Sequence, residues 1–274
     1  MGFEEMSMIA LRRTTARLAY SAMKPRVMQI LSGLNKDQWQ SRETLVARQN
    51  SQIQRLLEYA YTYVPYYQDL FKKIGFHPAD FASDPATFKE LPLLDKQTAR
   101  KNHERLITTE EPCRRNLVRV ATGGTTGEPL HLLHGPVYLD SNTAHIYHKM
   151  SWSGWRVGDP QGWLWGHAVV GQGARPSVAN RAKNQLVQRL ESNAFHMTRE
   201  SLDRFASQLE GKPGCVVWSY VSSMVQFAQF VRQRGHNIRA RAVYTSGEPL
   251  FDHQRALIHE TFGCRVHSNY SCVE

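Results

Sequence analysis

Cysteine is scarce in this 274-residue chain, which has four, and no two of them have the C-x-x-C spacing. We therefore expect neither a cysteine zinc site nor a disulfide framework, but reduced thiols and a cytoplasmic location. Long apolar runs are also lacking, since none approaches the length of a membrane span. Glu4 and Glu5 argue against a signal peptide at the N-terminus.

Negative charge is in short supply, with 24 Asp and Glu against 34 Lys and Arg, a formal net charge of +10. This excess favours anionic partners, such as a nucleotide, coenzyme A, nucleic acid or an acidic membrane surface. The basic residues are scattered and carry no DNA- or RNA-binding signature, so we do not expect nucleic-acid binding. With 41% hydrophobic and 21% charged residues, the composition predicts a globular protein of one or two domains.

Two histidine pairs could suggest a site for a transition metal. His131/His134 and His145/His148 are each spaced i, i+3, which on a helix would place two imidazoles on one face. No third ligand is apparent nearby, so solvated or core histidines are the preferred interpretation.

The N-terminal part of the chain reads as helical. Residues 6–34 carry basic side chains among apolar ones and predict an amphipathic helix, which either lies on the protein or contacts a membrane surface. We prefer the first alternative. Residues 41–73 predict two helices separated at Pro65, 78–95 a mostly irregular connection, and 96–104 a further short helix.

A glycine- and threonine-rich stretch, Ala121–Pro129, separates the apolar runs Leu117–Val120 and Leu130–Leu133. It predicts a loop between two strands, whose backbone N–H groups and hydroxyls could surround phosphate oxygens. An ordinary glycine-rich hairpin connection is the equal alternative. The stretch is not a Walker A loop, because Gly127 is followed by Glu128 rather than by lysine.

From Thr198 onward, apolar helical and strand patterns alternate. Helices are predicted where the apolar spacing is i, i+3, i+4, i+7 and a glycine follows, and strands in the short apolar runs between them. The predicted order is a helix that follows Thr198 and is ended by Gly211, strand 215–219, helix 221–234, strand 241–245, helix 252–262 and strand 264–268. Two successive β-α-β units imply an α/β fold with a parallel sheet, and ligands bind outside the carboxyl ends of such strands.

The segment Ala60–Arg100 closely resembles the N-terminal region of the phenylacetate:coenzyme A ligase family and its capsule-biosynthesis (CapK-like) relatives, which are adenylate-forming enzymes. The glycine-rich stretch then resembles their motif [ST]-[ST]-G-[ST]-T-G-x-P-K, although Gly123 replaces a hydroxyl residue and Leu130 replaces the lysine. The resemblance implies phosphate contacts from Thr122, Gly123, Gly124, Thr125, Thr126 and Gly127.

Two later segments complete the resemblance. Thr245–Leu250 resembles G-[GA]-E-P-[LW], and Asn269–Glu274 resembles Y-G-x-T-E with Ser271 and Val273 as departures. By resemblance, the residues beside adenine are Ser246, Gly247, Glu248, Pro249, Asn269 and Tyr270. Glu274 would help to hold Mg²⁺.

Aromatic residues alternate with glycines from Trp152 to Gly173, a composition that suits an acyl-pocket wall or a packed core equally well. We assign Trp165, Gly166 and His167 to the substrate pocket as a hypothesis.

The resemblance covers 42–274 and implies the ATP-dependent activation of a carboxylic acid to an acyl adenylate, followed by transfer to coenzyme A or to an alcohol or amine. We expect a basic helical segment (1–40), a helical region (41–115) and part of an adenylation core (116–274), without the family's C-terminal lid domain and its catalytic lysine. The chain would then be an inactive fragment. The alternative is a non-catalytic nucleotide-binding or interaction remnant, and a nucleic-acid or membrane-surface binder is a distant third.

Overall fold

The computed structural model describes residues 3–122, 129–166 and 178–271. The chain divides into two compact units, one combining Met1–Leu31 with Thr143–Cys272, and a second built around Ser32–Asn142. These units do not coincide with the division at residues 40 and 115 expected from the sequence, which stays a prediction.

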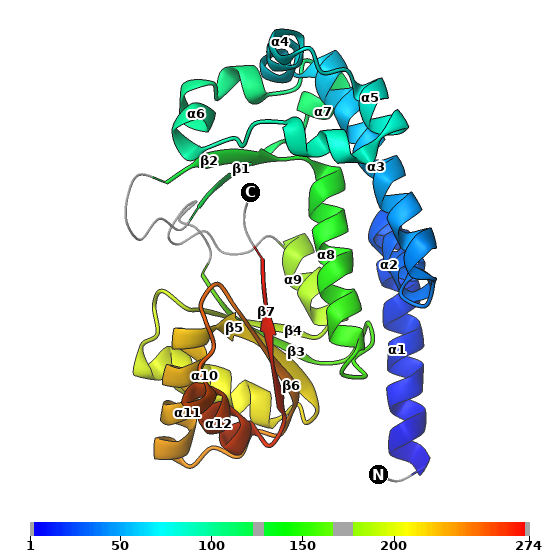
Figure 1. Ribbon diagram of the computed structural model, residues 1–274. Coiled ribbons are helices and arrows are strands. Elements are labelled where there is room, and N and C mark those ends of the chain that lie inside the picture. The colour runs from blue at the N-terminus through cyan, green and yellow to red at the C-terminus, as the bar shows by residue number, and fades with distance from the viewer. Residues whose placement is uncertain (1–2, 123–128, 167–177, 272–274) are drawn as a thin grey trace. The chain divides into compact units, whose positions relative to one another are not determined.

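The first unit contains a five-stranded sheet in which every neighbouring pair of strands is parallel (Figure 1). The order is β4-β3-β5-β6-β7. Its strands are β3 (Gln161–Trp165), β4 (Arg189–Asn193), β5 (Cys215–Tyr220), β6 (Ala240–Ser246) and β7 (Arg265–Asn269). The predicted α/β class and parallel sheet are confirmed, whereas β3 and β4 were not expected.

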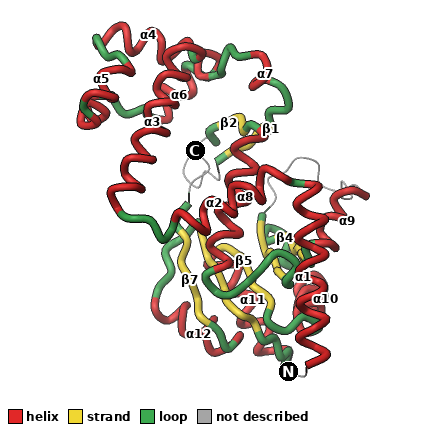
Figure 2. Tube along the Cα trace, turned by 90° about the vertical axis from the view of Figure 1, so that its right-hand side faces the viewer, coloured by secondary structure: helices red, strands yellow, loops and turns green. Residues whose placement is uncertain are grey.

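Three helices cover one face of this sheet: α10 (Arg199–Glu210), α11 (Val221–Arg234) and α12 (Asp252–Phe262). Their buried apolar side chains form one core with the strand residues beneath them, and Figure 2 shows α11 and α12 beside the yellow strands. Gly235 and Gly263 end α11 and α12 with φ of 73° and 63°, a left-handed conformation that glycine adopts without strain. All three helices occupy the predicted positions.

The other face of the sheet carries a row of stacked rings that we call the aromatic ladder: Trp163, Trp218, Tyr244 and His267. Adjacent members are direct partners in the strand register, with ring centroids 5.6, 4.9 and 4.7 Å apart. The Arg189 guanidinium lies over Trp163 at 4.1 Å and extends the ladder at its outer end. The hydroxyl of Tyr244 donates to the backbone oxygen of Lys149, 2.7 Å away, on α8 (Pro136–Ser151).

Two helices, α1 (Phe3–Met23) and α2 (Pro25–Asp37), replace the single helix expected over residues 6–34. The prediction was wrong because Pro25 lacks an N–H and starts a new helix. On its inner side α1 buries Ala16 and Tyr20 in the first unit. The guanidinium of Arg13 donates to both carboxylate oxygens of Asp159, at 2.7 and 2.8 Å, and Asp159 is only 2% exposed.

The second unit is mainly helical and has a small aromatic core of Leu57, Phe71, Phe76 and Phe81. Its elements are α3 (Arg42–Tyr63), α4 (Pro65–Ile74), α5 (Pro78–Ser83), η1 (Pro85–Glu90), α6 (Lys96–Lys101), η2 (Glu104–Leu106), α7 (Glu111–Arg114), β1 (Val118–Ala121) and β2 (His131–His134). The break at Pro65 is confirmed. The expectation of an irregular 78–95 was wrong, because Pro78 and Pro85 each begin a short helix capped by the preceding residue.

None of the described helices is long and apolar enough to cross a membrane. His131 and His134 lie on β2 rather than on a helix, so their odd spacing places them on opposite faces of the strand. Among the described residues, no three His, Cys, Asp or Glu side chains are grouped to hold a metal ion.

Candidate functional site

The carboxyl ends of the parallel strands bring several of the predicted site residues to one edge of the sheet. Trp165, Tyr220, Ser246 and Asn269 are the last residues of β3, β5, β6 and β7. Since parallel strands all point the same way, these four residues line a single edge. Of these, Tyr220 was not singled out from the sequence.

Ser246 and Asn269, both predicted to lie beside adenine, are joined by a polar network. The hydroxyl of Ser246 lies 2.9 Å from that of Ser271 and accepts from the Asn269 side-chain nitrogen at 3.4 Å. Ser246 is buried, with 2% exposure, whereas Tyr270 directly after β7 is 94% exposed. The network therefore fixes the ends of β6 and β7, and the ring of Tyr270 projects into solvent.

A cation that sequence reasoning missed joins this network. Lys149 Nζ donates to the side-chain oxygen of Asn269 at 2.7 Å, from the last turn of α8. Partial burial lowers the pKa of Lys149, the direction expected when an ammonium loses hydration. The only signal in the sequence was a basic residue near a helix end, which does not reveal a partner 120 residues away.

Gly247 and Glu248 form the turn after β6. Gly247 has φ of 82°, and a Cβ atom there would lie 3.0 Å from the ring of Tyr220. The Glu248 carboxylate accepts hydrogen bonds from the backbone N–H and hydroxyl of Ser222, at 2.6 and 2.8 Å. Glu248 thus satisfies a free N–H in the first turn of α11, where the N-cap residue makes no side-chain hydrogen bond. Pro249 follows and is exposed.

The predicted substrate residues Trp165 and Gly166 lie against a cluster of aromatic rings at the same edge. Trp165 stacks on Tyr220 with centroids 4.2 Å apart and planes 19° apart, and Phe195 stacks on Tyr220 from 6.1 Å. A Cβ atom on Gly166 would come within 2.2 Å of the Phe195 ring, so any other residue at 166 would displace that ring, which is 61% exposed. Burial, and then the neighbouring Glu248, raise the pKa of the Tyr220 hydroxyl.

The glycine-rich loop connects β1 and β2, which pair as antiparallel strands in agreement with the predicted loop between two strands. Thr122 closes the connection, since its N–H donates to Leu130 O and its hydroxyl accepts from Leu130 N, both at 3.0 Å. Gly123, Gly124, Thr125, Thr126, Gly127, His167 and Glu274 lie outside the described residues. Their phosphate, substrate and metal roles, and the convergence of this loop with the strand ends, stay predictions.

Leu130, which stands where the related motif has lysine, is 6% exposed. It lines an apolar cavity of about 1100 Å³ within the second unit, together with Leu117 and Leu132. A charged ammonium at this position would lose its hydration in those surroundings. The leucine therefore fits its local environment.

No family model and no curated protein matches the chain. Solved structures of 2-hydroxyisobutyryl-CoA ligase do. The complex with 2-HIB-AMP and CoA in the thioesterification state aligns with a TM-score of 0.66 and 17% identity, over 83% of this chain and 49% of that one. An open conformation with the same ligands aligns with a TM-score of 0.61 and 16% identity, over 80% and 48%. The chain thus shares the fold of an adenylate-forming ligase and spans about half the length of these structures.

Proposed function

We propose that the chain forms the nucleotide- and acyl-binding part of an adenylate-forming ligase. The carboxylate of an acid attacks the α-phosphorus of ATP, giving an acyl adenylate and pyrophosphate, and a coenzyme A thiol then takes the acyl group and releases AMP. The observation that carries the proposal is the fold shared with a ligase solved with 2-HIB-AMP and CoA. The predicted adenine segments at the carboxyl ends of β6 and β7 support it.

In this proposal, the residues at the carboxyl ends of the strands bind different parts of the substrates. The backbone of Gly247 allows close approach of the adenine, and the exposed Tyr270 ring offers a stacking surface for it. Lys149 supplies positive charge beside Asn269. Trp165 and Gly166, with His167, line the acyl group. Separately from this edge, the backbone N–H groups of residues 122–127 are assigned to the phosphates by the motif that they resemble.

Magnesium is the metal that this reaction implies. Glu274 would hold it through a hard carboxylate oxygen, the ligand type that Mg²⁺ prefers. The bound ion would neutralise phosphate charge.

ATP binding and acid-dependent exchange of pyrophosphate into ATP test the proposal. Tyr270→Ala should weaken ATP binding measured by calorimetry about tenfold, because a base stacked on an aromatic ring is stabilised by roughly 1–3 kcal/mol. Trp39→Ala is the matched control, since Trp39 is also a largely exposed aromatic residue, at 82%. An affinity for ATP that Tyr270→Ala leaves unchanged would contradict the adenine assignment.

Exchange should be assayed with aryl acids, including phenylacetate, and with aliphatic and hydroxy acids. This panel also tests the narrower identity, a phenylacetate-type or capsule-type ligase, and alcohols and amines should be compared with coenzyme A as acceptors. Pyrophosphate exchange that depends on one class of acid would identify the class of the substrate.

A second candidate function is nucleotide binding without catalysis. The buried Leu130 favours it, because the motif's usual cation is replaced by an apolar side chain facing an apolar cavity. Specific ATP binding without exchange for any acid would support this alternative over the ligase only if exchange is still absent when a ligase's C-terminal lid domain, with its catalytic lysine, is joined to the chain.

A further inference from the structure

A polar pocket lies in the first unit, at the opposite end of the sheet from the candidate nucleotide site. Arg189 is the first residue of β4 and Lys212 shortly precedes β5, so both mark the amino ends of parallel strands. The cavity has a volume of about 490 Å³, within the usual range for small-molecule sites. We call it the basic pocket, and it is lined by Arg181, Asn184, Gln185, Gln188, Arg189, Leu190 and Lys212.

Among the described residues, the lining contains three cationic side chains and no acid. In the described part of the chain, Arg189 is paired with Glu191, with 2.6 Å between Nε and Oε1. Lys212 donates to a neutral partner, the side-chain oxygen of Gln188, at 3.2 Å. The pocket therefore has more positive than negative charge, and the imbalance favours an anionic ligand.

Lys183, on α9 (Val178–Leu186) beside the pocket, responds to the same charge. Burial lowers its pKa most, and the positive charge of Arg189 lowers it further, while Glu191 opposes the shift. An anion in the pocket would relieve this repulsion between cations.

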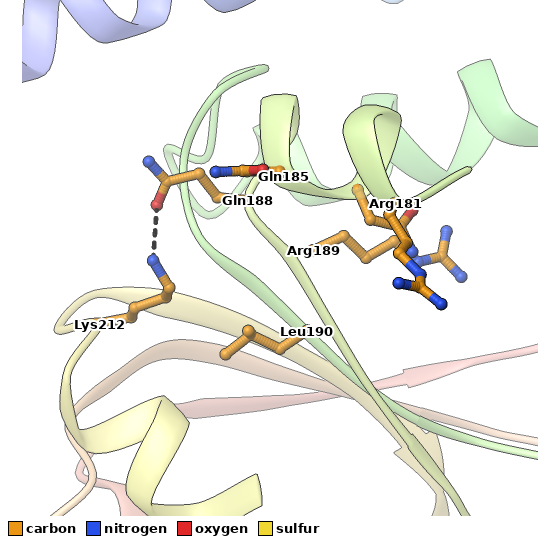
Figure 3. Close-up of a pocket in the computed structure, with 7 residues that line it drawn as sticks. Arg181, Gln185, Gln188, Arg189, Leu190 and Lys212 are labelled. Carbon is orange, nitrogen blue, oxygen red and sulfur yellow. Dashed lines mark hydrogen bonds between the residues drawn. The ribbon is translucent and has the colours of Figure 1, made fainter. Parts of the chain in front are cut away.

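The groups around the pocket are held in place before any ligand arrives. The Arg189 guanidinium is stacked on Trp163 at 4.1 Å, and Trp163 belongs to the aromatic ladder. Gln188 has φ of 49°, an unusual conformation for a residue other than glycine, and Lys212 donates to its side chain. In Figure 3 both arginine side chains extend toward one end of the pocket, and the Lys212–Gln188 pair closes the other. Cations at two ends fit a ligand with two anionic groups.

We propose that the basic pocket binds a small molecule that carries a diphosphate group. Arginine recognises phosphate through several N–H groups at once, lysine adds a point charge, and the carboxamides of Asn184, Gln185 and Gln188 supply neutral donors. This pocket lies at the amino ends of the strands and the candidate nucleotide site at their carboxyl ends, so the length of the strands separates the two. It therefore does not depend on the proposed ligase activity.

The direct test is calorimetric titration with pyrophosphate and with ADP, two sources of the same diphosphate group, with sulfate for comparison. The double variant Arg181→Gln/Lys212→Gln should bind the better of the two ligands at least about tenfold more weakly, since each lost charge-assisted hydrogen bond contributes about that factor. Arg199→Gln/Arg204→Gln is the matched control, because it removes the same charge from exposed positions of the same unit that do not line the pocket. This control should keep the original affinity.

Trp163 reports where the ligand binds, which separates this pocket from the nucleotide site. Ligand binding beside Arg189 should change tryptophan fluorescence, and Trp163→Phe should remove that change at ligand concentrations that calorimetry shows to be saturating for the variant. Lys212→Arg should retain binding because it keeps the charge, which distinguishes lost recognition from misfolding. Equal weakening in both double variants, affinity for sulfate equal to that for the diphosphates, or an unchanged signal in Trp163→Phe would overturn the proposal.

Discussion

At the scale of single residues, His236 shows how the surface of the first unit couples stability to pH. Its Nδ1 lies 3.1 Å from Glu210 and its Nε2 lies 3.2 Å from Asp203, which Arg234 also approaches at 3.5 Å. Partial burial acts to lower the pKa of His236, but the hydrogen bonds to Glu210 and Asp203 outweigh it, and the pKa is raised. The hydrogen bond to His236 in turn lowers the pKa of both carboxyl groups.

The signs of these shifts define a pH window. The folded pKa of His236 is raised. The stabilisation that His236 gives the folded state is therefore complete below the unfolded value of 6.5, and it is lost as the pH rises through the folded pKa. The carboxylates contribute above their unfolded values of 3.8 and 4.5, and this contribution is lost as the pH falls through their folded pKa. The three groups together stabilise the fold most in mildly acidic solution.

We predict that His236→Gln reduces the difference in the free energy of unfolding between pH 6 and pH 8, measured by urea denaturation. The neutral amide cannot gain the charge that the two carboxylates favour. His253→Gln, at an exposed position on α12, serves as the control and should leave the pH dependence as it is. The same pH dependence in both variants would show that His236 does not titrate as described.

At the scale of elements, the docking of α1 depends on the loop before β3. Gly158 has φ of 97°, and a Cβ atom there would lie 2.8 Å from Ala16 Cβ and 3.2 Å from Arg13 Cα. Next to it, Asp159 receives the guanidinium of Arg13. Gly158, which leaves room for the backbone of α1, and the buried Asp159, which forms an ion pair with Arg13, therefore together hold α1 in place.

We predict that Gly158→Ala lowers the free energy of unfolding by roughly 2–4 kcal/mol, because a left-handed alanine is strained and its methyl group meets the backbone of α1. Gly33→Ala in α2 should instead stabilise by about 0.5–1 kcal/mol, since alanine is the better helix former. The nearest described side chain to a Cβ at Gly33, that of Asp37, lies 3.8 Å away. Equal effects of the two substitutions in chemical denaturation would refute the close packing of α1 at Gly158.

At the scale of the whole molecule, the division into two units predicts how the chain unfolds. Each unit has its own buried core, one around the parallel sheet and one around Phe71 and its neighbours. Of the six tryptophans only Trp39 belongs to the second unit. Tryptophan fluorescence therefore reports mainly on the first unit, whereas far-UV circular dichroism reports on the helices of both.

In Trp39→Phe, the fluorescence and circular dichroism transitions in urea should have different midpoints, because units with separate cores are not required to unfold together. Wild-type protein measured in parallel provides the reference for the substitution. Superimposable transitions at all wavelengths would show that the two units unfold as one cooperative body.

Local sequence determined much of the fold from Thr198 onward. The apolar spacing of α10, α11 and α12 and the glycines after α11 and α12 act within one or two helical turns, so they can be read without knowing the partner segments. The same applies to the break at Pro65 and to the position of Ser246 and Asn269 at strand ends. By contrast, β4 has the polar sequence Arg-Leu-Glu-Ser-Asn and becomes a strand by pairing with β3.

Only the tertiary structure decided which side chains meet. Lys149 reaches Asn269, Glu248 caps α11, and Arg189 lies over Trp163 and borders the same cavity as Lys212. No sequence spacing encodes these contacts. They arise because parallel pairing aligns strands from distant parts of the chain, collecting their carboxyl ends at one edge and their amino ends at the other.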